Sequence, residues 1–285
     1  MQRTAIIGGS GLYQIDGIEV LDELDIDTPY GKPSDTLTLA KIHDQEVVFL
    51  PRHGKTHSIP PHQINYRANI YAMKLAGVSQ IVSISAVGSL REDIAPGDFI
   101  LVDQFVDRTR ERASTFFDGP IVAHVSLADP VCASLRNQLQ HACLEQNIKT
   151  HEKGTYMVMQ GPQFSTHAES KLYRSWGMDV IGMTNMPEAK LAREAEICYA
   201  TVAMCTDYDC WHEDKDDVSV SNVLEVMHEN VEKAKVMLDT FFKGHSKSAQ
   251  SCACHQALEH GIFADLKTQD DDALRPIHAL VQRFL

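Results

Sequence analysis

Short apolar runs alternate with segments of helical periodicity along most of the chain, and this alternation limits the possible folds more than any other feature. Extended runs are predicted at residues 4–8, 37–42, 46–50, 80–86, 99–105, 156–160 and 197–204. Helices are predicted at residues 65–75, 129–144, 188–196 with Pro187 as the first helical position, and 220–242. Strands that alternate with helices predict an α/β fold, here a single domain with a central, mixed and mainly parallel β-sheet flanked by helices.

Charge and hydropathy narrow the possible partners. The 285 residues include 26 basic and 39 acidic side chains, which give a formal net charge of −13. This balance disfavours a nucleic acid or an anionic membrane as partner, so any phosphate site must be local. No apolar run approaches the roughly 18 residues that span a bilayer. We therefore expect a cytoplasmic protein that binds small molecules, with neither a nucleic-acid nor a membrane partner.

Seven cysteines are scattered along the chain, a pattern unlike a secreted disulfide framework. Only Cys252, Cys254 and His255 stand close enough in sequence to resemble a set of metal ligands. A convincing zinc site needs a second pair of ligands, which the neighbouring sequence lacks. We therefore predict no metal, and expect either a strained local disulfide or reduced thiols at Cys252 and Cys254.

Two aspartates stand at the end of the last predicted strand. Asp207 and Asp209 follow the apolar run 197–204, at the kind of strand exit where open α/β sheets bind ligands. Alternate residues of an extended chain point the same way, so both carboxylates are expected to face one ligand. A carboxylate pair suits a heterocycle that bears N–H donors. The alternative is a helix N-cap or a turn, which also favours aspartate after a strand.

Three other predicted strands end in groups that bind anions. The first leads into a glycine-rich turn around Ser10, whose hydroxyl and neighbouring backbone N–H groups suit a small anion. This turn lacks both the G-x-G-x-x-G spacing and the lysine of a P-loop, which disfavours a dinucleotide or a nucleoside triphosphate. Arg52 and His53 follow another strand, and Ser85 ends a third. A tight turn or a solvated patch explains any one of these segments, but three together favour an anion site.

Ordered motifs carry a resemblance to a known family over about residues 4–240. They are Gly8-Gly9-Ser10-Gly11, Arg52-His53-Gly54, Asn65-Tyr66-Arg67-Ala68-Asn69, Gly88-Ser89-Leu90-Arg91-Glu92, Pro96-Gly97-Asp98, Gly161-Pro162-Gln163-Phe164-Ser165, Met183-Thr184 with Pro187-Glu188, and Thr206-Asp207-Tyr208-Asp209-Cys210-Trp211. In these motifs the chain resembles the trimeric purine nucleoside phosphorylase family. The resemblance implies a nucleoside phosphorylase-like domain over residues 1–243 and a helical C-terminal tail, residues 244–285, packed on the same domain or on a neighbouring subunit.

The resemblance also implies an activity, the phosphorolysis of an N-glycosidic bond to a ribose 1-phosphate and a free purine. Inorganic phosphate is then a co-substrate, and no cofactor is expected. The implied phosphate-binding residues are Ser10, Arg52, His53, Ser85, Ala86 and Thr184. The implied substrate-binding residues are His57, His124, Phe164, Met183, Asp207 and Asp209. In relatives the residue matching His124 comes from a neighbouring subunit, which implies a homo-oligomer, either a trimer or a dimer of trimers.

Asp207 is the predicted catalytic residue. Breaking the bond builds positive charge on the sugar and negative charge on the leaving base, so a proton donor is needed at N7 of the purine. Burial and the nearby Asp209 are expected to raise the pKa of Asp207 enough for it to act as the general acid.

Three positions bear on the choice of substrate. Relatives that cleave inosine and guanosine carry Glu, Asn and His where this chain has Ser165, Asp207 and Val220. A carboxylate accepts from a 6-amino group, so Asp207 favours adenine, and Val220 with Leu224 favours an apolar 5'-methylthio group. We therefore expect 5'-methylthioadenosine to be cleaved to adenine and 5-methylthioribose 1-phosphate. The alternatives are a phosphorylase of 5'-methylthioinosine or of purine nucleosides more broadly and, in another class, a non-catalytic nucleoside-binding module.

Overall fold

The computed structural model describes residues 3–13, 17–212, 220–244 and 252–285, without the side chains of Ser10, Tyr13 and residues 220–223. The strands are β1 (Arg3–Gly8), β2 (Glu19–Leu24), β3 (Leu37–Ile42), β4 (Gln45–Pro51), β5 (Val78–Ser89), β6 (Phe99–Val102), β7 (Gln104–Asp107), β8 (Thr150–His151), β9 (Thr155–Val158), β10 (Val180–Gly182) and β11 (Cys198–Asp207). The α-helices are α1 (Tyr66–Leu75), α2 (Ala133–Glu145), α3 (His167–Ser175), α4 (Glu188–Glu194), α5 (Val220–Gly244), α6 (Asp271–Leu274) and α7 (His278–Val281).

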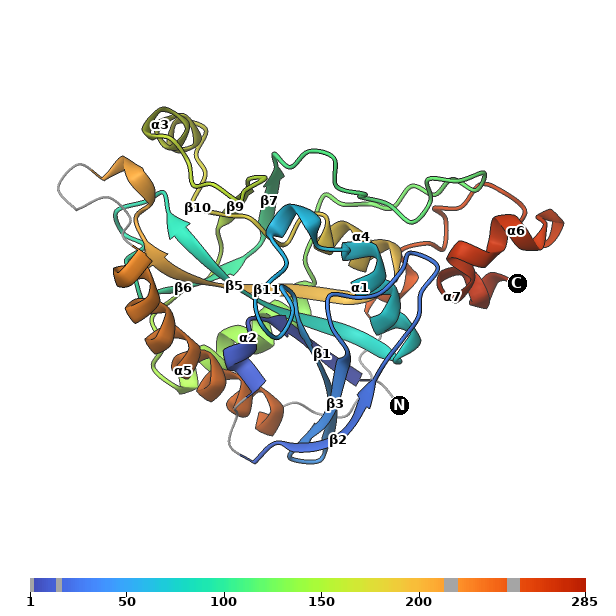
Figure 1. Ribbon diagram of the computed structural model, residues 1–285, viewed down its shortest axis with the longest axis horizontal. Helices are drawn as coiled ribbons and strands as arrows, with labels where there is room; N and C mark the ends of the chain where they lie inside the picture. Colours follow the sequence, from blue (N-terminus) through green and yellow to red (C-terminus); the bar gives the residue numbers. More distant parts are fainter. Residues whose placement is uncertain (1–2, 14–16, 213–219, 245–251) are drawn as a thin grey trace.

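The long strand β5 organises the sheet (Figure 1). Strand β1 lies parallel to β4 and β5, and β11 lies parallel to the other edge of β5. From this parallel centre the sheet continues through antiparallel pairs, β4 with β3 and β3 with β2 on one side and β11 with β6 on the other. A second arm runs from the end of β5 through β10 and β9 to β7. The prediction of a mixed, mainly parallel sheet flanked by helices is confirmed.

Helices cover both faces of the parallel centre. On one face α1 packs with α4 and α7, and on the other α2 packs with α5. Each face of the sheet has its own apolar core, and successive residues of a strand point into opposite cores. On β1, Ile7 lies in the core under α1 and α4, and Ile6 lies in the core under α2 and α5. Burial on both faces explains why the central strands read as nearly continuous apolar runs in the sequence.

The run predicted as one strand at 99–105 forms two strands in different parts of the sheet. Strand β6 pairs with β11 and β7 pairs with β9, and the chain passes between them at Asp103. Asp103 pairs with Gly154 at this crossing: its backbone N–H donates to Gly154 O at 3.3 Å, and its carboxylate accepts from Gly154 N at 3.0 Å. The prediction of a single strand was wrong, because an apolar run does not reveal which partner strand each half will have.

The sequence interpretation missed β2, the two-residue β8, β10 and α3. Strand β2 is largely exposed and β10 has only three residues, so neither carries a strong apolar run. Helix α3 does carry a signal, since Thr166 caps its N-terminus and Glu169 bonds back to the cap, as in the T-x-x-E capping box. The helix predicted at 188–196 begins at Glu188, with Pro187 as its N-cap rather than as its first residue.

The described part of the tail, residues 252–285, consists of short turns rather than long helices. Helices α6 and α7 have four residues each and are joined by a 3-10 turn. Leu280 and Val281 belong to the same apolar core as α1, and the backbone N–H of Ala279 donates to Tyr71 Oη at 3.2 Å. The tail thus packs on α1 of the same chain, while the division of the chain at residue 243 stays a prediction.

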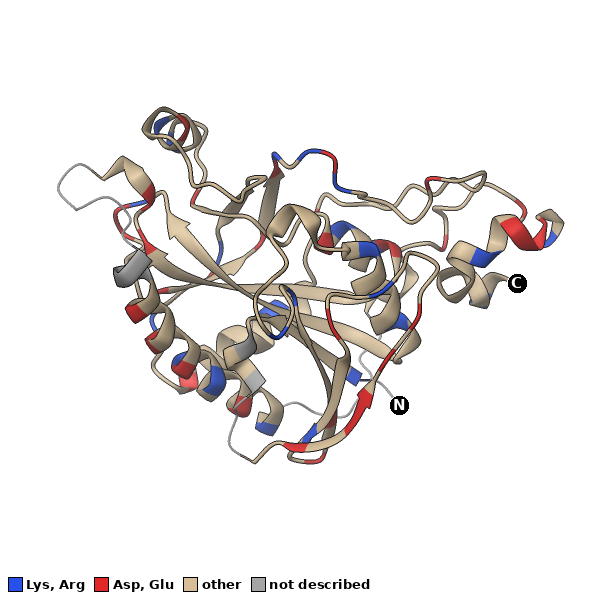
Figure 2. Cartoon of the chain, viewed as in Figure 1, with Lys and Arg blue, Asp and Glu red and all other residues tan. Residues whose placement is uncertain are grey.

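Acidic side chains recur on the outer elements β2, α5 and α6, and on α5 basic side chains alternate with them (Figure 2). The excess of acidic residues is therefore spread along the periphery. Across the described ranges, no helix combines the length and the apolar character that a bilayer crossing requires.

A buried carboxylate fixes the end of the tail. Glu196 is 5 % exposed, and its two carboxylate oxygens accept from Arg283 Nε and Nη2, each at 2.8 Å. The variant Arg283→Met leaves this carboxylate with the backbone N–H of Leu258. Because the Arg283 side chain is 39 % exposed, we expect a loss of about 1–2 kcal/mol in the free energy of unfolding, below the roughly 3–5 kcal/mol of a fully buried pair.

Denaturant unfolding at a fixed protein concentration measures this loss. Arg275→Met is the matched control, because it breaks an exposed pair with Asp272 (3.3 Å) and should leave the free energy of unfolding nearly unchanged. Equal losses in the two variants would contradict the anchoring role of Arg283.

Candidate active site

Strands β1, β4, β5 and β11 run parallel and end at one edge of the sheet, where most of the predicted site residues lie. Ligands of open α/β sheets bind at such an edge. In the pairing of β5 with β11, Ser85 lies opposite Ala203 and Ala86 lies opposite Met204. Three residues beyond Ser85, Gly88 lies opposite Asp207. At about 3.3 Å per residue, Ser85 and Asp207 therefore lie roughly 10 Å apart along the strands.

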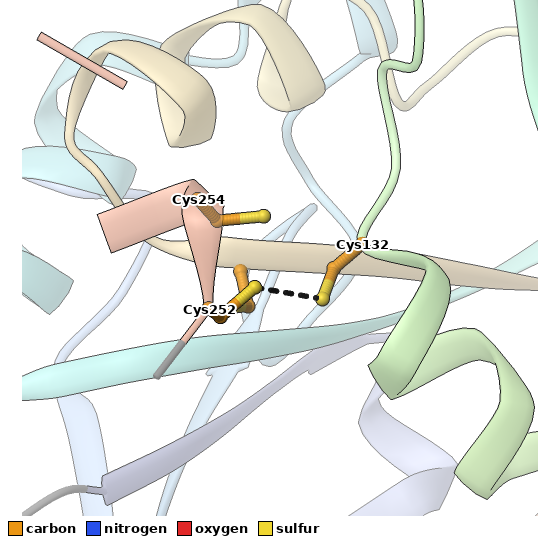
Figure 3. A group of neighbouring side chains, drawn as sticks. Cys132, Cys252 and Cys254 are labelled. Carbon is orange, nitrogen blue, oxygen red and sulfur yellow. Dashed lines mark hydrogen bonds between the residues drawn. The ribbon is translucent and has the colours of Figure 1, made fainter. Parts of the chain in front are cut away.

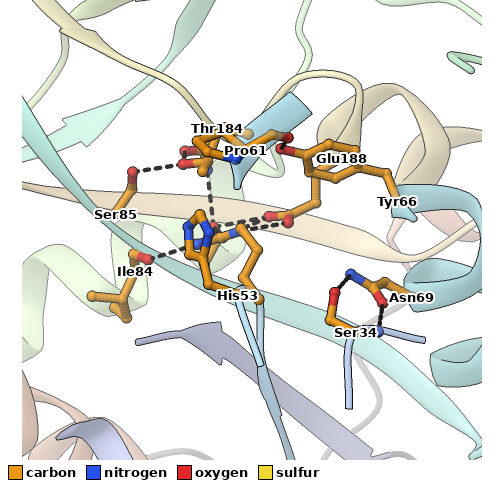
Figure 4. A network of polar contacts seen from close by, with 12 residues as sticks. Ser34, His53, Pro61, Tyr66, Asn69, Ile84, Ser85, Thr184 and Glu188 are labelled. Atoms are coloured by element: carbon orange, nitrogen blue, oxygen red, sulfur yellow. Dashed lines mark hydrogen bonds and ion pairs between the residues drawn. The ribbon is translucent and has the colours of Figure 1, made fainter. Parts of the chain in front are cut away.

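The Arg52 guanidinium is buried and held by an ion pair with Glu188 (Figure 4). Its Nε and Nη2 donate to the two carboxylate oxygens at 2.8 and 2.9 Å, and Nη2 also donates to Ser83 Oγ at 2.6 Å. Its Nη1 donates to the backbone O of Ile84 at 3.2 Å. Four of the five N–H groups are thus engaged, and one on Nη1 remains for a bound anion. Burial opposes both charges, but their attraction lowers the pKa of Glu188 and raises that of Arg52, so both stay ionised.

Three hydroxyl groups meet at the neighbouring end of β5. Ser85 Oγ lies 2.9 Å from Thr184 Oγ1 and 3.1 Å from Tyr156 Oη. Ser85 and Thr184 are 6 % and 7 % exposed, so their hydroxyls are almost removed from water. Buried hydroxyls that point at one another can turn to donate to the oxygens of an anion, and such bonds are strong where the local dielectric is low.

His53 belongs to the same polar region and is neutral at physiological pH (Figure 4). Its Nδ1 lies 2.8 Å from the backbone O of Ile59, and because a carbonyl oxygen only accepts, Nδ1 carries the proton. Burial lowers the pKa of His53 to about 4, and the charges of Arg52 and His57 contribute to the shift. The remaining nitrogen, Nε2, is therefore an unprotonated acceptor.

Asn185 ties the ion pair to the hydroxyl groups. It is fully buried in the left-handed conformation (φ 73°), and its Nδ2 lies 2.9 Å from both Ser83 Oγ and Thr201 Oγ1 and 2.6 Å from Tyr199 Oη. Its Oδ1 accepts from Thr184 Oγ1 at 3.1 Å. The anion end of the site is thus one continuous hydrogen-bonded network.

Asp207 ends β11 at a bulge. The register with β5 shifts between Cys205 and Asp207, and a bulge of this kind re-aims the side chain that follows it. Asp207 Oδ2 accepts from Thr206 Oγ1 at 2.7 Å, and Oδ1 accepts from the backbone N–H of Asp209 at 2.8 Å. Burial raises the pKa of Asp207, and these two hydrogen bonds lower it only in part. Asp209 lowers this pKa through its backbone N–H, while repulsion between the two carboxylates, which is mutual, opposes the ionisation of both.

Asp209 lies beyond the strand, in a 3-10 turn with φ 50°. We expected the two carboxylates to point the same way because alternate residues of an extended strand do so. That expectation was wrong, and a turn brings the two aspartates together instead. Asp209 Oδ2 accepts from Ser170 Oγ of α3 at 2.5 Å. Burial raises the pKa of Asp209, the bond from Ser170 lowers it, and the charge of Asp207 raises it. Ionising both carboxyls is costly, which favours a protonated member of the pair.

Three further predicted substrate contacts, Met183, Phe164 and Ser165, come from two loops that meet at Gly161. Met183 packs against Gly161, where a Cβ would lie 2.5 Å from Met183 Sδ, so only a glycine (φ 67°) permits this approach. Ser165 Oγ lies 3.7 Å from Met159 Sδ. Phe164 is 60 % exposed and offers an apolar ring.

The structure describes only some of the residues predicted to bind the 5' end of the nucleoside. His57 is exposed and stacks on His53 with ring centroids 4.5 Å apart. Leu224 of α5 is 62 % exposed. The side chains of Ser10 and Val220 lie outside the described residues, so their predicted roles stay predictions.

His124 lies apart from the other predicted residues of its own chain. It stands in the long segment between β7 and α2, which extends toward α6 (Figure 1). The backbone N–H of His124 donates to Gly261 O at 2.9 Å, and its ring lies 5.9 Å from that of Phe263, centroid to centroid. Both side chains are exposed, Phe263 by 79 %. This segment and the tail therefore form one projecting arm.

Several residues that hold the site were not predicted from the sequence. They are Ser83, Tyr156, Ser170, Asn185, Glu188 and Thr206. Glu188 and Thr206 stood inside the motifs noted above, next to Pro187 and Asp207, and this position was the available signal. The others act on partners far away along the chain, which no local pattern reveals.

Known proteins of similar sequence and structure share one described activity. The profile of the phosphorylase superfamily matches residues 3–243. The S-methyl-5'-thioadenosine phosphorylase of Geobacter sulfurreducens is 50 % identical over 265 residues, which cover 93 % of this chain and 92 % of the relative. A solved methylthioadenosine phosphorylase from an Antarctic soil metagenomic library matches with a TM-score of 0.94 and 43 % identity, covering 98 % of both chains. A variant of the adenosine/methylthioadenosine phosphorylase of Schistosoma mansoni, in complex with methylthioadenosine, matches with a TM-score of 0.80 and 36 % identity over 85 % of this chain and 91 % of its own.

The packing of Gly182 against Tyr156 makes the hydroxyl network testable. A Cβ at Gly182 would overlap Tyr156 Oη, so Gly182→Ala must displace this ring and its bond to Ser85. We expect a loss of about 1–3 kcal/mol in the free energy of unfolding, together with weaker binding of phosphate in calorimetric titration. Gly119→Ala is the matched control, because a Cβ there meets nothing within 4 Å. Phosphate binding that is unchanged in Gly182→Ala would contradict the role of this network.

Proposed function

The chain belongs to the phosphorylase superfamily, and on that premise we propose that it cleaves 5'-methylthioadenosine with inorganic phosphate, giving adenine and 5-methylthioribose 1-phosphate. The observation that carries the proposal is the pairing of β5 with β11, which sets buried hydroxyl donors and a half-buried carboxyl roughly 10 Å apart at one edge of the sheet. This spacing leaves room for a ribose between a phosphate and a purine. The activity named for the similar proteins supports the choice of nucleoside.

Phosphate is the nucleophile and a co-substrate, and no cofactor is part of the proposal. The Ser85 hydroxyl and the remaining N–H of Arg52 donate to its oxygens, and the Thr184 hydroxyl turns from Asn185 Oδ1 to do the same. Neutral His53 accepts from the hydroxyl of hydrogen phosphate through Nε2. Ser10 and Ala86 belong to the same cradle at the ends of β1 and β5. Because Glu188 compensates the charge of Arg52, hydroxyl and backbone donors carry much of the recognition.

Asp207 is the general acid for the leaving base. A phosphate oxygen forms a bond to C1' while the C1'–N9 bond breaks, and the electron pair of that bond passes into the purine. Protonated Asp207 gives its proton to N7, so adenine leaves neutral and the aspartate is left ionised. The Thr206 hydroxyl lies 3.2 Å from Val87 O and 2.7 Å from Asp207 Oδ2. It donates to Val87 O before the transfer and turns to the new carboxylate after it.

Specificity follows from the two ends of the nucleoside. At the base, ionisable Asp207 accepts from the 6-amino group of adenine, and Ser165 leaves room where relatives cleaving 6-oxopurines have Glu. At the sugar, Val220 and Leu224 on the first turns of α5 offer no hydrogen bond to a 5'-hydroxyl. An unpaired buried hydroxyl costs about 1–3 kcal/mol, which favours the methylthio group.

The active form is a homo-oligomer, a trimer or a dimer of trimers, in the cytoplasm. The arm that carries His124 projects from its own subunit, and Phe263 on it is 79 % exposed. Val122, 49 % exposed, stands beside Phe263 where the two segments pair, and exposed apolar side chains that lie together are typical of a surface that another subunit covers. This arm delivers His124 to the site of a neighbouring subunit, near the 5' end of the nucleoside.

Release of adenine from 5'-methylthioadenosine should require phosphate. With phosphate the product is a pentose 1-phosphate, detected by 31P NMR, and without phosphate no adenine should appear. Equal release in the two buffers would identify a hydrolase, and binding without turnover would identify a non-catalytic module. 5'-Methylthioinosine serves as the competing substrate, and a higher specificity constant for it would overturn the assigned base.

In the pH profile of kcat/KM at saturating phosphate, the fall at alkaline pH should reflect the ionisation of Asp207, because the protonated form of Asp207 is the active one. Burial raises its pKa and the Thr206 hydroxyl lowers it, so Thr206→Val should move this fall to higher pH. Asp207→Asn should remove the fall and lower kcat by about 10²–10⁴. Thr38→Val, which removes a hydroxyl bonded to exposed Glu23, is the control and should leave the profile unchanged. A fall that persists in Asp207→Asn would belong to another group.

A further inference from the structure

Four cysteine sulfurs meet at the end of the sheet opposite the active site. The Sγ atoms of Cys132, Cys198, Cys252 and Cys254 all lie within 4.8 Å of one another. Cys132 and Cys252 are the pair drawn with a contact in Figure 3, at 3.5 Å, and Cys254 lies beside them. All four thiols are free of disulfide bonds. The cluster plays no part in the proposed reaction.

The four thiols come from three segments that the fold brings together. Cys132 is the N-cap of α2, Cys198 is the first residue of β11, and Cys252 and Cys254 belong to the first turn of the described tail. Sequence reasoning predicted no metal because the pair at 252 and 254 lacked a second pair. The fold supplies that second pair from residues 54 and more positions away in sequence.

We propose that these four cysteines bind one zinc ion that fixes the tail to the domain. A tetrahedral ion at the typical Zn–S distance of about 2.3 Å holds its four sulfurs about 3.8 Å apart, which the observed cluster reaches with small side-chain movements. An iron–sulfur cluster would hold its cysteine sulfurs further apart than a single ion does. Zinc is also the common ion for a site made of four thiolates.

The surroundings suit a structural rather than a catalytic ion. Cys132, Cys198 and Cys254 are 3 %, 5 % and 6 % exposed, so the site is closed and leaves no position for a substrate. His255 Nδ1 donates to the backbone O of Glu196 at 3.0 Å, and Nε2 lies 3.7 Å from Cys198 Sγ, where only the doubly protonated ring could donate to a ligating sulfur. The ten residues of β11 separate this cluster from Asp207 by roughly 30 Å.

The zinc site makes the tail part of the folding unit. Ligands from α2, β11 and the tail are joined by one ion, so metal binding adds to the free energy of folding. A disulfide is the competing outcome, since two of the four thiols could pair under oxidising conditions. The cytoplasm, which is the expected location, keeps thiols reduced and favours the metal.

The test is metal analysis of the full-length protein, expressed with added zinc and purified with a phosphine reductant and without immobilised metal. We expect close to one zinc per chain by mass spectrometry, lost in Cys254→Ser and retained in Cys143→Ser, which removes a buried thiol outside the cluster. A strong chelator should lower the melting temperature of the wild type by several degrees and leave that of Cys254→Ser unchanged. Phosphorolysis at moderate temperature should persist in both variants.

Replacement of the native ion by Co²⁺ in the wild type keeps the proposal testable if Cys254→Ser fails to fold. Four thiolates around Co²⁺ should give the intense visible absorption of a tetrahedral thiolate site. Wild-type protein that holds no zinc, gives no such spectrum and melts unchanged with chelator would overturn the proposal. So would iron in place of zinc, or a mass that is lower without reductant by the hydrogens of a disulfide. These outcomes are independent of the substrate, so failure here leaves the proposed reaction intact.

Discussion

The parallel pairing of β5 with β11 is the constraint on which the candidate site depends. Nine of the ten residues of β11 are buried, so the strand cannot slip by one residue without turning its apolar side chains from one core to the other. The fixed register places Ser85 and Asp207 three residues apart along the strands, at the same edge of the sheet. The bulge before Asp207 then turns its carboxyl without altering the buried part of the strand. A similar fixed register on β1 and β4 places Arg52 beside this edge.

The ion pair of Arg52 with Glu188 gives the anion end its rigidity. Removing two charges from water is costly, and the cost is offset only where each charged group is fully hydrogen-bonded. Glu188 meets this condition, because Ser83 Oγ and Tyr199 Oη donate to Oε1 at 3.0 and 2.8 Å in addition to the guanidinium. The pair joins β4, β5 and α4, and leaves one oriented N–H of Arg52 for phosphate. Donors fixed before the anion arrives need no reorganisation during the reaction.

Strand-level patterns in the sequence were sufficient to predict the α/β fold and the ends of the strands that carry the site. Asp207 was predicted because a carboxylate after a buried strand is a local signal. Asn185, Ser170 and Tyr156 were not, because each acts on a partner far away in sequence. The second pair of cysteines was missed for the same reason. The break at Asp103 depended on which strands the two halves would pair with, and an apolar run is silent on that choice.

The most direct measurement is a crystal structure of the protein with phosphate and the 7-deaza analogue of 5'-methylthioadenosine, which lacks the nitrogen that Asp207 protonates. The phosphate should lie against Ser85, Thr184 and His53, with position 7 of the base beside the Asp207 carboxyl and the ribose between them. Phosphate bound elsewhere, or a base whose position 7 points away from Asp207, would contradict the assignment of this edge of the sheet as the catalytic site.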